Sequence, residues 1–246
     1  QQPCMVFHFN FDTTLSFFHS TGAMAVGLLA LGGGGWLLWY LLVLRPAAKQ
    51  LTPWGPEWLA RMVSGWLYKF GSWYLNFSHN GEEALKWGIW KDDKQHLWVW
   101  HPHGAFTVAA LYFVAHWHAS NYPGGTRGKR FCAVAPLLLK IPFLAEFLLL
   151  CHSRSVDSKT FNALLANGGT VAIQPGGLPE QVATDPNAEC LFFPTRLGFI
   201  RSAIRYGTPL IPIYAFGENQ LYATATWTRR LNLWFYRTLG TGNLVV

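Results

Sequence analysis

Charged side chains are scarce in this chain of 246 residues, and acidic ones are the scarcer kind. Together they make up 13% of the sequence, whereas an average soluble domain has about 25%. So little charge excludes a disordered tail or a coiled coil. With 19 Lys and Arg against 12 Asp and Glu, the formal net charge is +7, which favours anionic partners such as phosphates or acidic lipid headgroups. Nucleic acid is disfavoured, because the basic residues are spread among apolar ones without a recognition motif.

Cysteine is also rare. The sequence has 4 cysteines, at positions 4, 132, 151 and 190, and no two of them form a Cys-x-x-Cys pair. This usage argues against a disulfide scaffold and fits a reducing compartment with buried, unreactive thiols.

A long uncharged stretch is present instead. No Asp, Glu, Lys or Arg occurs from Thr13 to Leu44, and residues 21–44 would form a helix about 36 Å long, enough to cross a bilayer. Four glycines, Gly32–Gly35, weaken a straight helix, so a re-entrant hairpin competes with a single span. The alternatives are a buried core helix or a signal peptide, but a basic n-region is missing. We expect residues 1–50 to form a membrane segment.

Basic residues follow this segment, which predicts that the downstream chain faces the cytosol. Residues 51–80 then predict an amphipathic helix. Large apolar residues recur on one face at spacings of three or four: Trp58, Met62, Trp66, Phe70, Trp73 and Phe77. Because aromatic rings favour the bilayer interface, we expect this helix to lie on the membrane, with an ordinary helix packed on the core as the alternative.

Residues 81–246 alternate short apolar runs with helical stretches, a pattern typical of α/β architecture. The expected strands cover residues 97–100, 131–135, 170–174 and 210–216. The expected helices cover residues 105–118, 142–150, 158–167 and 195–206. Pro209 and Pro212 predict that the last strand lies at an edge of the sheet or is interrupted.

The motif His101-Pro102-His103-Gly104 stands between a strand and a helix. Proline favours an extended His101, so the turn presents His103 and Gly104 at a helix N-terminus. Backbone N–H groups there can stabilise an oxyanion, and an imidazole can take a proton from a hydroxyl group. The helix dipole would lower the pKa of the imidazole and keep it neutral. The alternative is a plain turn that contains two histidines.

A second motif, residues 174–180, reads QPGGLPE and also follows a strand. Gly176 and Gly177 make a tight loop that can admit a ligand, and Glu180 is its only acid. A carboxylate that accepts the distal N–H of a catalytic imidazole orients that imidazole. A strand-to-loop turn without function is the alternative.

A third motif runs from Arg196 to Glu218 and includes Arg201 and Arg205, which share a helix face. These three arginines are candidates for contacts with donor phosphates, with Lys129, Arg130 and Lys140 as weaker ones; solvated helix arginines are the alternative.

Together, HPHG, PGGxxE and RxGFxRxAxxxGxxLIPxxxFGE resemble the type-two diacylglycerol acyltransferase family, which also contains monoacylglycerol and wax-alcohol acyltransferases. The resemblance covers residues 94–222. It implies an α/β fold with a mixed sheet flanked by helices, like that of the glycerolipid acyltransferases, behind an N-terminal transmembrane or re-entrant segment. It places essential histidines at His101 and His103 and the loop glutamate at Glu180.

The resemblance also implies the reaction: transfer of an acyl chain from acyl-coenzyme A to diacylglycerol at the endoplasmic-reticulum membrane or the surface of a lipid droplet. His103 would be the general base, Glu180 would orient it and His101 would position the loop or the substrate. Gly104, Gly176 and Gly177 would contact substrate with the three arginines. We expect acyl-coenzyme A as co-substrate, no metal and no other cofactor. A homodimer is compatible with the sequence.

Two departures from the family pattern stand out. The stretch before HPHG reads WYLNFS, where many members have Tyr-Phe-Pro, and members continue beyond the point that corresponds to Val246. We therefore expect the chain to be part of a longer protein. The acid of the HxxxxD signature is absent, because Phe106 and Val108 stand five residues after the two histidines.

Two other classes of function are alternatives. A metal-dependent hydrolase would use His101, His103, His116 and His118, but residues two apart on a helix point to different sides, and no acid cluster accompanies them. A non-catalytic lipid-binding protein would explain the aromatic helix but neither Glu180 nor the arginines.

Overall fold

The computed structural model describes residues 32–76, 95–105, 107–108, 110, 129–189, 197–222 and 226–240. The chain divides into two compact units, Gln1–Arg45 and Pro46–Val246. In the first unit, residues 32–39 are helical, including all four glycines of the run, and the π-helix η1 (Tyr40–Leu44) follows. Among the described residues, no helix has both the length and the apolar character needed to cross a bilayer. Residues 21–31 of the expected membrane segment lie outside the described part.

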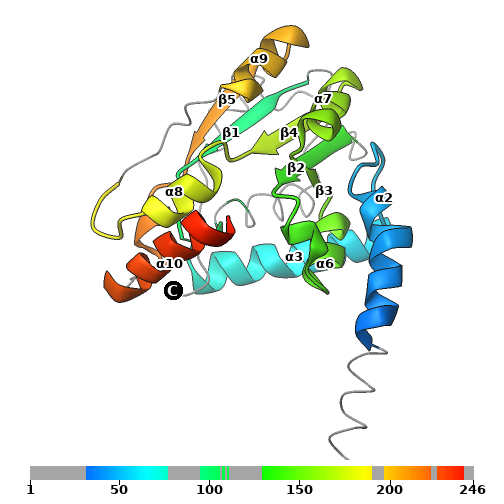
Figure 1. Ribbon diagram of the computed structural model, residues 1–246. Coiled ribbons are helices and arrows are strands. Elements are labelled where there is room, and N and C mark those ends of the chain that lie inside the picture. Colours follow the sequence, from blue (N-terminus) through cyan, green and yellow to red (C-terminus); the bar gives the residue numbers. More distant parts are fainter. Residues whose placement is uncertain are drawn as a thin grey trace, which may run out of the picture. The chain divides into compact units, whose positions relative to one another are not determined.

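The second unit is built on a five-stranded sheet (Figure 1). The strands are β1 (Leu97–His101), β2 (Arg130–Val134), β3 (Ser153–Ser155), β4 (Thr170–Ile173) and β5 (Leu210–Tyr214), in the order β3-β2-β4-β1-β5. All four pairings in the described sheet are parallel. The expected α/β class is confirmed. The expected mixed sheet is wrong for these strands, because the chain crosses back to the same end of the sheet before each new strand begins, so all of them run in one direction.

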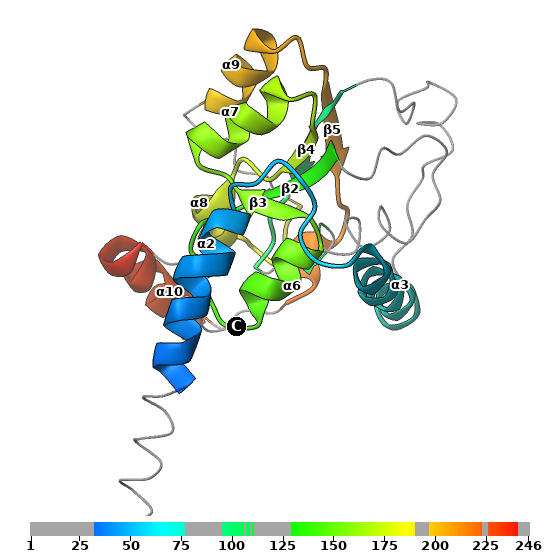
Figure 2. The ribbon, with the colours of Figure 1, turned by 90° about the vertical axis from the view of Figure 1, so that its right-hand side faces the viewer.

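Helices pack on one face of the sheet through a common apolar core. Leu97 and Val99 of β1 contact this core together with Phe161 and Leu164 of α7 (Ser158–Ala166) and Phe199 of α9 (Gly198–Arg205). Figure 2 shows α7 and α9 on this side of the sheet. The alternate residues Trp98 and Trp100 pack on the opposite face in a second cluster. The interior strand β1 is therefore buried on both faces, as expected of a parallel sheet.

Most of the predicted elements are confirmed. Four of the five strands and the helices α6 (Leu144–Leu150), α7 and α9 coincide with predicted segments. The strand β3 and the helices α8 (Gly177–Ala183) and α10 (Thr226–Leu239) were missed. The expected loop at Glu180 is wrong: the residue lies in α8, because Pro179 is in the first turn, where proline needs no N–H partner. Most of the helix expected at 105–118 lies outside the described residues.

The outer strand β3 is covered by the chain that precedes α3. Ser155 N–H donates to Ala48 O at 3.1 Å, and the guanidinium of the fully buried Arg154 donates to the carbonyls of Gln50, Thr52 and Ser153. Arg154 also lies over the ring of Phe131, 5.3 Å from its centroid. Burial lowers the pKa of Arg154 to about 10, so it remains charged at neutral pH and holds this segment to the sheet.

The other outer strand, β5, contains the prolines that predicted an edge position. Two hydrogen bonds to β1 flank β5: Leu97 N–H donates to Pro209 O just before the strand, and Ala215 N–H donates to His101 O just after it. The odd-numbered residues therefore bond to β1, and the nitrogen of Pro212 faces away from it. A missing N–H is tolerated there, so the predicted edge position is confirmed.

The aromatic helix α3 (Glu57–Tyr74) packs on the unit through its small residues. Ala60, Ser64 and Gly71 are buried, whereas Trp66 is 64% and Trp73 80% exposed. The predicted gathering of the large residues on one face is confirmed for the described positions 58–73; Phe77 lies outside them. The helix packs on the unit through its small side chains and leaves its large ones exposed, and a position on the membrane stays a prediction.

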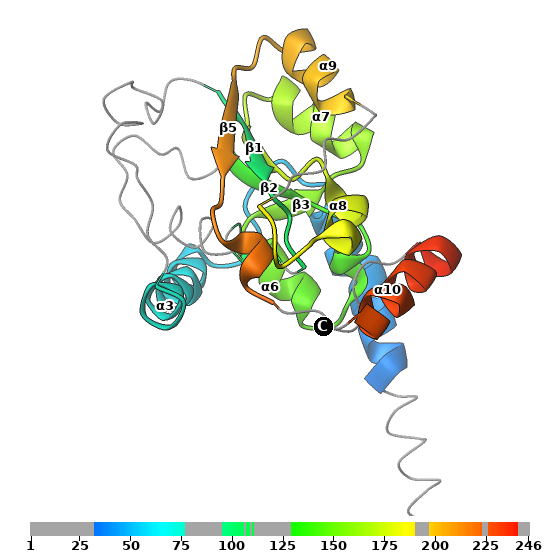
Figure 3. The same cartoon turned by 90° about the vertical axis from the view of Figure 1, so that its left-hand side faces the viewer.

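The last helix, α10, repeats this pattern. Its polar Thr228 and Asn232 are buried, while Trp227 and Trp234 are exposed. It packs against α8 (Figure 3). Apolar side chains are also exposed around the 3₁₀ turn η3 (Leu138–Lys140), at Leu137, Ile141 and Phe143.

Candidate active site

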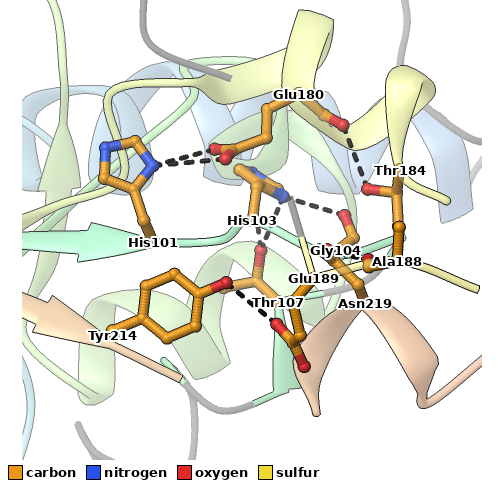
Figure 4. A network of polar contacts seen from close by, with 10 residues as sticks. All are labelled: His101, His103, Gly104, Thr107, Glu180, Thr184, Ala188, Glu189, Tyr214 and Asn219. Carbon is orange, nitrogen blue, oxygen red and sulfur yellow. Dashed lines mark hydrogen bonds and ion pairs between the residues drawn. The ribbon is translucent and has the colours of Figure 1, made fainter. Parts of the chain in front are cut away.

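A buried pair of ionisable side chains lies where β1 and β4 end. His101 is the last residue of β1, and Glu180 lies in α8, which follows β4 after a short turn. Because β1 and β4 are parallel neighbours, their carboxyl ends meet at one edge of the sheet. The His101 Nδ1 atom is 3.2 Å from Glu180 Oε1 and 3.3 Å from Oε2 (Figure 4). The side chains are only 9% and 3% exposed, so little water screens their interaction.

This pairing differs from the expected one, in which Glu180 orients His103. The structure pairs Glu180 with His101, because His101 still belongs to the strand beside β4 whereas His103 lies beyond Pro102 in the turn. His103 Nδ1 instead lies 3.2 Å from Thr107 Oγ1 and 3.4 Å from Gly104 O. The structure therefore brings both histidines and Glu180 to one site with a different partner for each imidazole.

The environment of His103 keeps its imidazole neutral. Burial lowers the pKa of His103, and His101 lowers it further, while the Gly104 carbonyl and the charge of Glu180 oppose the shift. The direction matches the prediction from the helix dipole, but burial is the main cause. A neutral imidazole at pH 7 can accept a proton.

The glycines of the site leave room for carboxylates. A Cβ on Gly176 would lie 2.0 Å from Glu180 Oε2, so the space beside Gly176 is taken by Glu180 itself. Gly177 has open space around its Cα and a φ of +52°. A substrate contact at either glycine stays a prediction.

Gly104 is constrained in the same way by a residue that sequence reasoning missed. It has a φ of +64°, and a Cβ there would lie 2.8 Å from Glu218 Cγ. Glu218 opens the 3₁₀ helix η4 (Glu218–Gln220) after β5, and its Oε1 accepts the Val108 N–H at 2.8 Å. This N–H is one of the donors expected to stabilise an oxyanion, and the carboxylate already occupies it. The contact of Glu218 depends on the position of β5 beside β1, which the sequence alone does not show.

The basic residues do not join this cluster. Arg201 and Arg205 are exposed on α9, which leads into Pro209 beside the start of β1. Figure 1 shows α9 and α8 at opposite ends of the sheet. Arg130 begins β2, Lys129 precedes it and Lys140 ends η3. Arg196 lies outside the described residues, and donor-phosphate contacts by any of these residues stay predictions.

The thiols in the described part of the chain are free and poorly reactive. Burial raises the pKa of Cys132 to about 12 and that of Cys151 to about 11. The predicted unreactive thiols are confirmed for these two; positions 4 and 190 lie outside the described residues. Within the same described ranges, no three His, Cys, Asp or Glu side chains are grouped as metal ligands. His116 and His118 are not among them.

Comparison with known proteins gives a consistent set of relatives. Residues 82–244 match the family described as diacylglycerol acyltransferase. Mouse acyl-CoA wax alcohol acyltransferase 2 is 30% identical over 62% of this chain and 53% of its own length. Diacylglycerol O-acyltransferase 2B of Umbelopsis ramanniana is 29% identical over 58% of this chain and 41% of its own. Bovine 2-acylglycerol O-acyltransferase 1 is 31% identical over 54% of this chain and 41% of its own length.

The chain spans about half the length of the curated relatives it matches. No solved structure matches it.

Proposed function

The chain belongs to the diacylglycerol acyltransferase family, and from that premise we propose that it is an acyl-coenzyme A-dependent O-acyltransferase that esterifies diacylglycerol at a membrane surface. The observation that carries the proposal is the buried His101–Glu180 pair beside a neutral His103 at the carboxyl ends of parallel strands. In open α/β sheets, ligands bind at this edge. Monoacylglycerol and long-chain alcohols are alternative acceptors, because relatives are named for both.

His103 is the general base in this proposal. The hydroxyl oxygen of the acceptor attacks the thioester carbonyl while His103 takes the hydroxyl proton. The C–O bond forms, the C–S bond breaks, and the proton passes from the imidazolium to the departing thiolate. The products are the ester and free coenzyme A, and no nucleophilic side chain or other cofactor is needed. Of the two imidazoles, that of His103 is the less buried, so a substrate reaches it more readily.

The His101–Glu180 pair supports this base from behind. Glu180 fixes His101 at the end of β1, and its negative charge also stabilises the imidazolium that forms on His103. A second assignment deserves the same test, because a carboxylate on Nδ1 is also the arrangement that orients a base in a triad. In that assignment His101 takes the proton and His103 binds the substrate.

Asparagine substitutions separate the two assignments. The amide Nδ2 of Asn reproduces His Nδ1, so His101→Asn keeps the bond to Glu180 but cannot act as a base. If His103 is the base, we expect His103→Asn to lower kcat by about 100-fold or more and His101→Asn to lower it by about tenfold or less. The reverse order would support His101 as the base. Near-normal turnover by both folded variants would refute histidine catalysis.

The exposed aromatic faces of α3 and α10 support action at a bilayer. We place the hydrophobic stretch 21–44 in the endoplasmic-reticulum membrane, as a span or a hairpin, with the catalytic unit on the cytosolic side or on a lipid droplet. The insoluble acceptor then arrives from the bilayer and acyl-coenzyme A from the cytosol.

The decisive experiment is an acceptor panel with the full chain in detergent micelles. Labelled acyl-coenzyme A is incubated with monoacylglycerol, diacylglycerol or a long-chain alcohol, and the lipid products are resolved. We expect labelled triacylglycerol to be the main product. Faster ester formation with another acceptor would reassign the substrate. Unchanged donor with every acceptor would instead identify a non-catalytic lipid-binding protein.

A further inference from the structure

Glu218 lies directly against the HPHG turn, although the proposed chemistry does not use it. Glu218 is 1% exposed. Its Oε1 accepts the Val108 N–H at 2.8 Å, and its Cγ and carbonyl oxygen fill the space where a Cβ of Gly104 would lie. Two consecutive parts of the turn, Gly104 and the start of the following helix, are therefore in contact with one side chain.

A second contact holds the same turn from the other side. Gln181 of α8 donates from Nε2 to Ala105 O at 2.7 Å. Gly104 and Val108 are thus held by η4, and Ala105 is held by α8. Thr107, whose hydroxyl lies 3.2 Å from His103 Nδ1, is in this held segment, so the segment that Glu218 fixes also supplies the neighbour of the proposed base.

The chemistry of the contact suits an anchoring role. The first N–H groups of a helix have no partner within the helix, and a carboxylate is a strong acceptor for them. In a buried place, loss of this acceptor leaves the N–H unsatisfied, which favours a shift of the turn.

We propose that Glu218 is a positioning residue for acyl transfer. By accepting the Val108 N–H, it fixes the turn that carries His103 and Gly104 and so sets the direction of the base toward the two substrates. The role rests on the proposed function and requires the acceptor oxygen rather than any contact with substrate. A displacement of about 1 Å in a reacting group lowers a rate by about 100-fold.

Three variants of the full chain test this role: Glu218→Ala, Glu218→Gln and Asp157→Ala. Glu218→Gln keeps Oε1 and therefore the bond. Asp157 is the matched control, because its carboxylate also accepts a helix N-terminal N–H, that of Thr160 at 3.0 Å, but in α7. For Glu218→Ala we expect kcat to fall about 30- to 100-fold with KM for acyl-coenzyme A changed less than about threefold. We expect Glu218→Gln and Asp157→Ala to keep kcat within about threefold of the parent.

Parent turnover by Glu218→Ala, or a Glu218→Gln variant as slow as Glu218→Ala, would overturn the role. If Glu218→Ala does not fold, Glu218→Asp takes its place, because the shorter side chain moves the acceptor oxygen away from the Val108 N–H by one methylene. We expect kcat of Glu218→Asp to be about tenfold lower than that of the parent. Parent activity in this variant would again overturn the role.

Amide hydrogen exchange at Val108 gives a readout independent of turnover. We expect exchange to become at least about tenfold faster in Glu218→Ala and to be unchanged in Glu218→Gln and Asp157→Ala. Unchanged exchange in Glu218→Ala would refute the role even in an active enzyme. A parent chain that transfers no acyl group to any acceptor would refute the proposed function and, with it, the positioning role. An active parent with an equally active Glu218→Ala variant would refute the positioning role alone.

Discussion

Each histidine of the site is supported by a glutamate that lies against a glycine. Glu180 fills the space beside Gly176 and contacts His101, and Glu218 fills the space beside Gly104, the residue after His103. In both places the missing side chain makes room for a buried carboxylate. Gly104 and Gly176 therefore act first on the protein's own acids, whatever they contact in a substrate.

The substitution Gly176→Ala tests this. Gly176 has φ −64° and ψ −33°, a backbone that alanine adopts freely, so the conflict is with Glu180, whose Oε2, Cδ and Cβ would lie 2.0, 2.6 and 2.7 Å from the added Cβ. We expect the carboxylate to leave His101 and kcat to fall about 100-fold. The double variant Gly176→Ala/Glu180→Ala should lose less than the two single variants together, because both changes remove the same contact.

Gly65→Ala is the control for this substitution, since nothing lies within 4 Å of its Cβ position. In the middle of α3 it should leave kcat unchanged and raise stability by about 0.5–1 kcal/mol. Additive losses in the Gly176→Ala/Glu180→Ala double variant would show that Gly176 acts on something other than Glu180.

At the scale of elements, α3 is unusual because its bulky side chains are turned away from the core. Its packing surface consists of Ala60, Ser64 and Gly71. The large apolar face is then left for another apolar phase, which in the proposed function is the bilayer.

Fluorescent labels on the full chain in vesicles test the direction of this face. With the cysteines at positions 4 and 190 replaced by serine, an environment-sensitive dye is attached at Trp66→Cys or, as a control, at Ile204→Cys on α9, which is 76% exposed. We expect the dye at position 66 to shift to the blue and to be quenched by brominated lipid, because α3 enters the interface. The dye at position 204 should remain in water. Equal water exposure at both positions would contradict the membrane role of α3.

The elements that the sequence predicted well are those with a local pattern. β1, β2, β4 and β5 are apolar runs bounded by turn residues, and α7 has a capping Asp157 and terminal glycines. β3 was missed because it has three residues, one of them a buried arginine. The partners of Glu180 and Glu218 were not predictable from the sequence, because they depend on the order β4-β1-β5, which no local pattern contains.

At the scale of the whole molecule, stability depends on a buried histidine outside the active site. His152 is buried between α6 and β3, with a φ of +58°. Burial, with a smaller contribution from the charge of Arg154, lowers its pKa to about 4 from the usual 6.5. As the pH falls below 6.5 the unfolded chain binds a proton at this residue, while the folded chain does so only near pH 4. Folding stability is therefore lost between these values, by about 3 kcal/mol in total.

His152→Asn removes the ionisable group and tolerates the positive φ. We expect the variant to lose about 3 kcal/mol less stability than the parent between pH 7 and pH 4. Urea unfolding of the full chain at a series of pH values measures this difference. The same pH dependence in both chains would show that folding does not shift the pKa of His152.

The two outer strands have a consequence for how copies of this protein can associate. Ala48 and Arg154 occupy one margin of the described sheet, and the proline ring of β5 interrupts the donors along the other. A foreign strand would find no continuous ladder on which to extend the sheet, so open-ended stacking and amyloid-like growth are disfavoured. Within the described part of the chain, helices and exposed apolar side chains are then the surfaces left for pairing of two copies, which would leave the ends of β1 and β4 free in each copy.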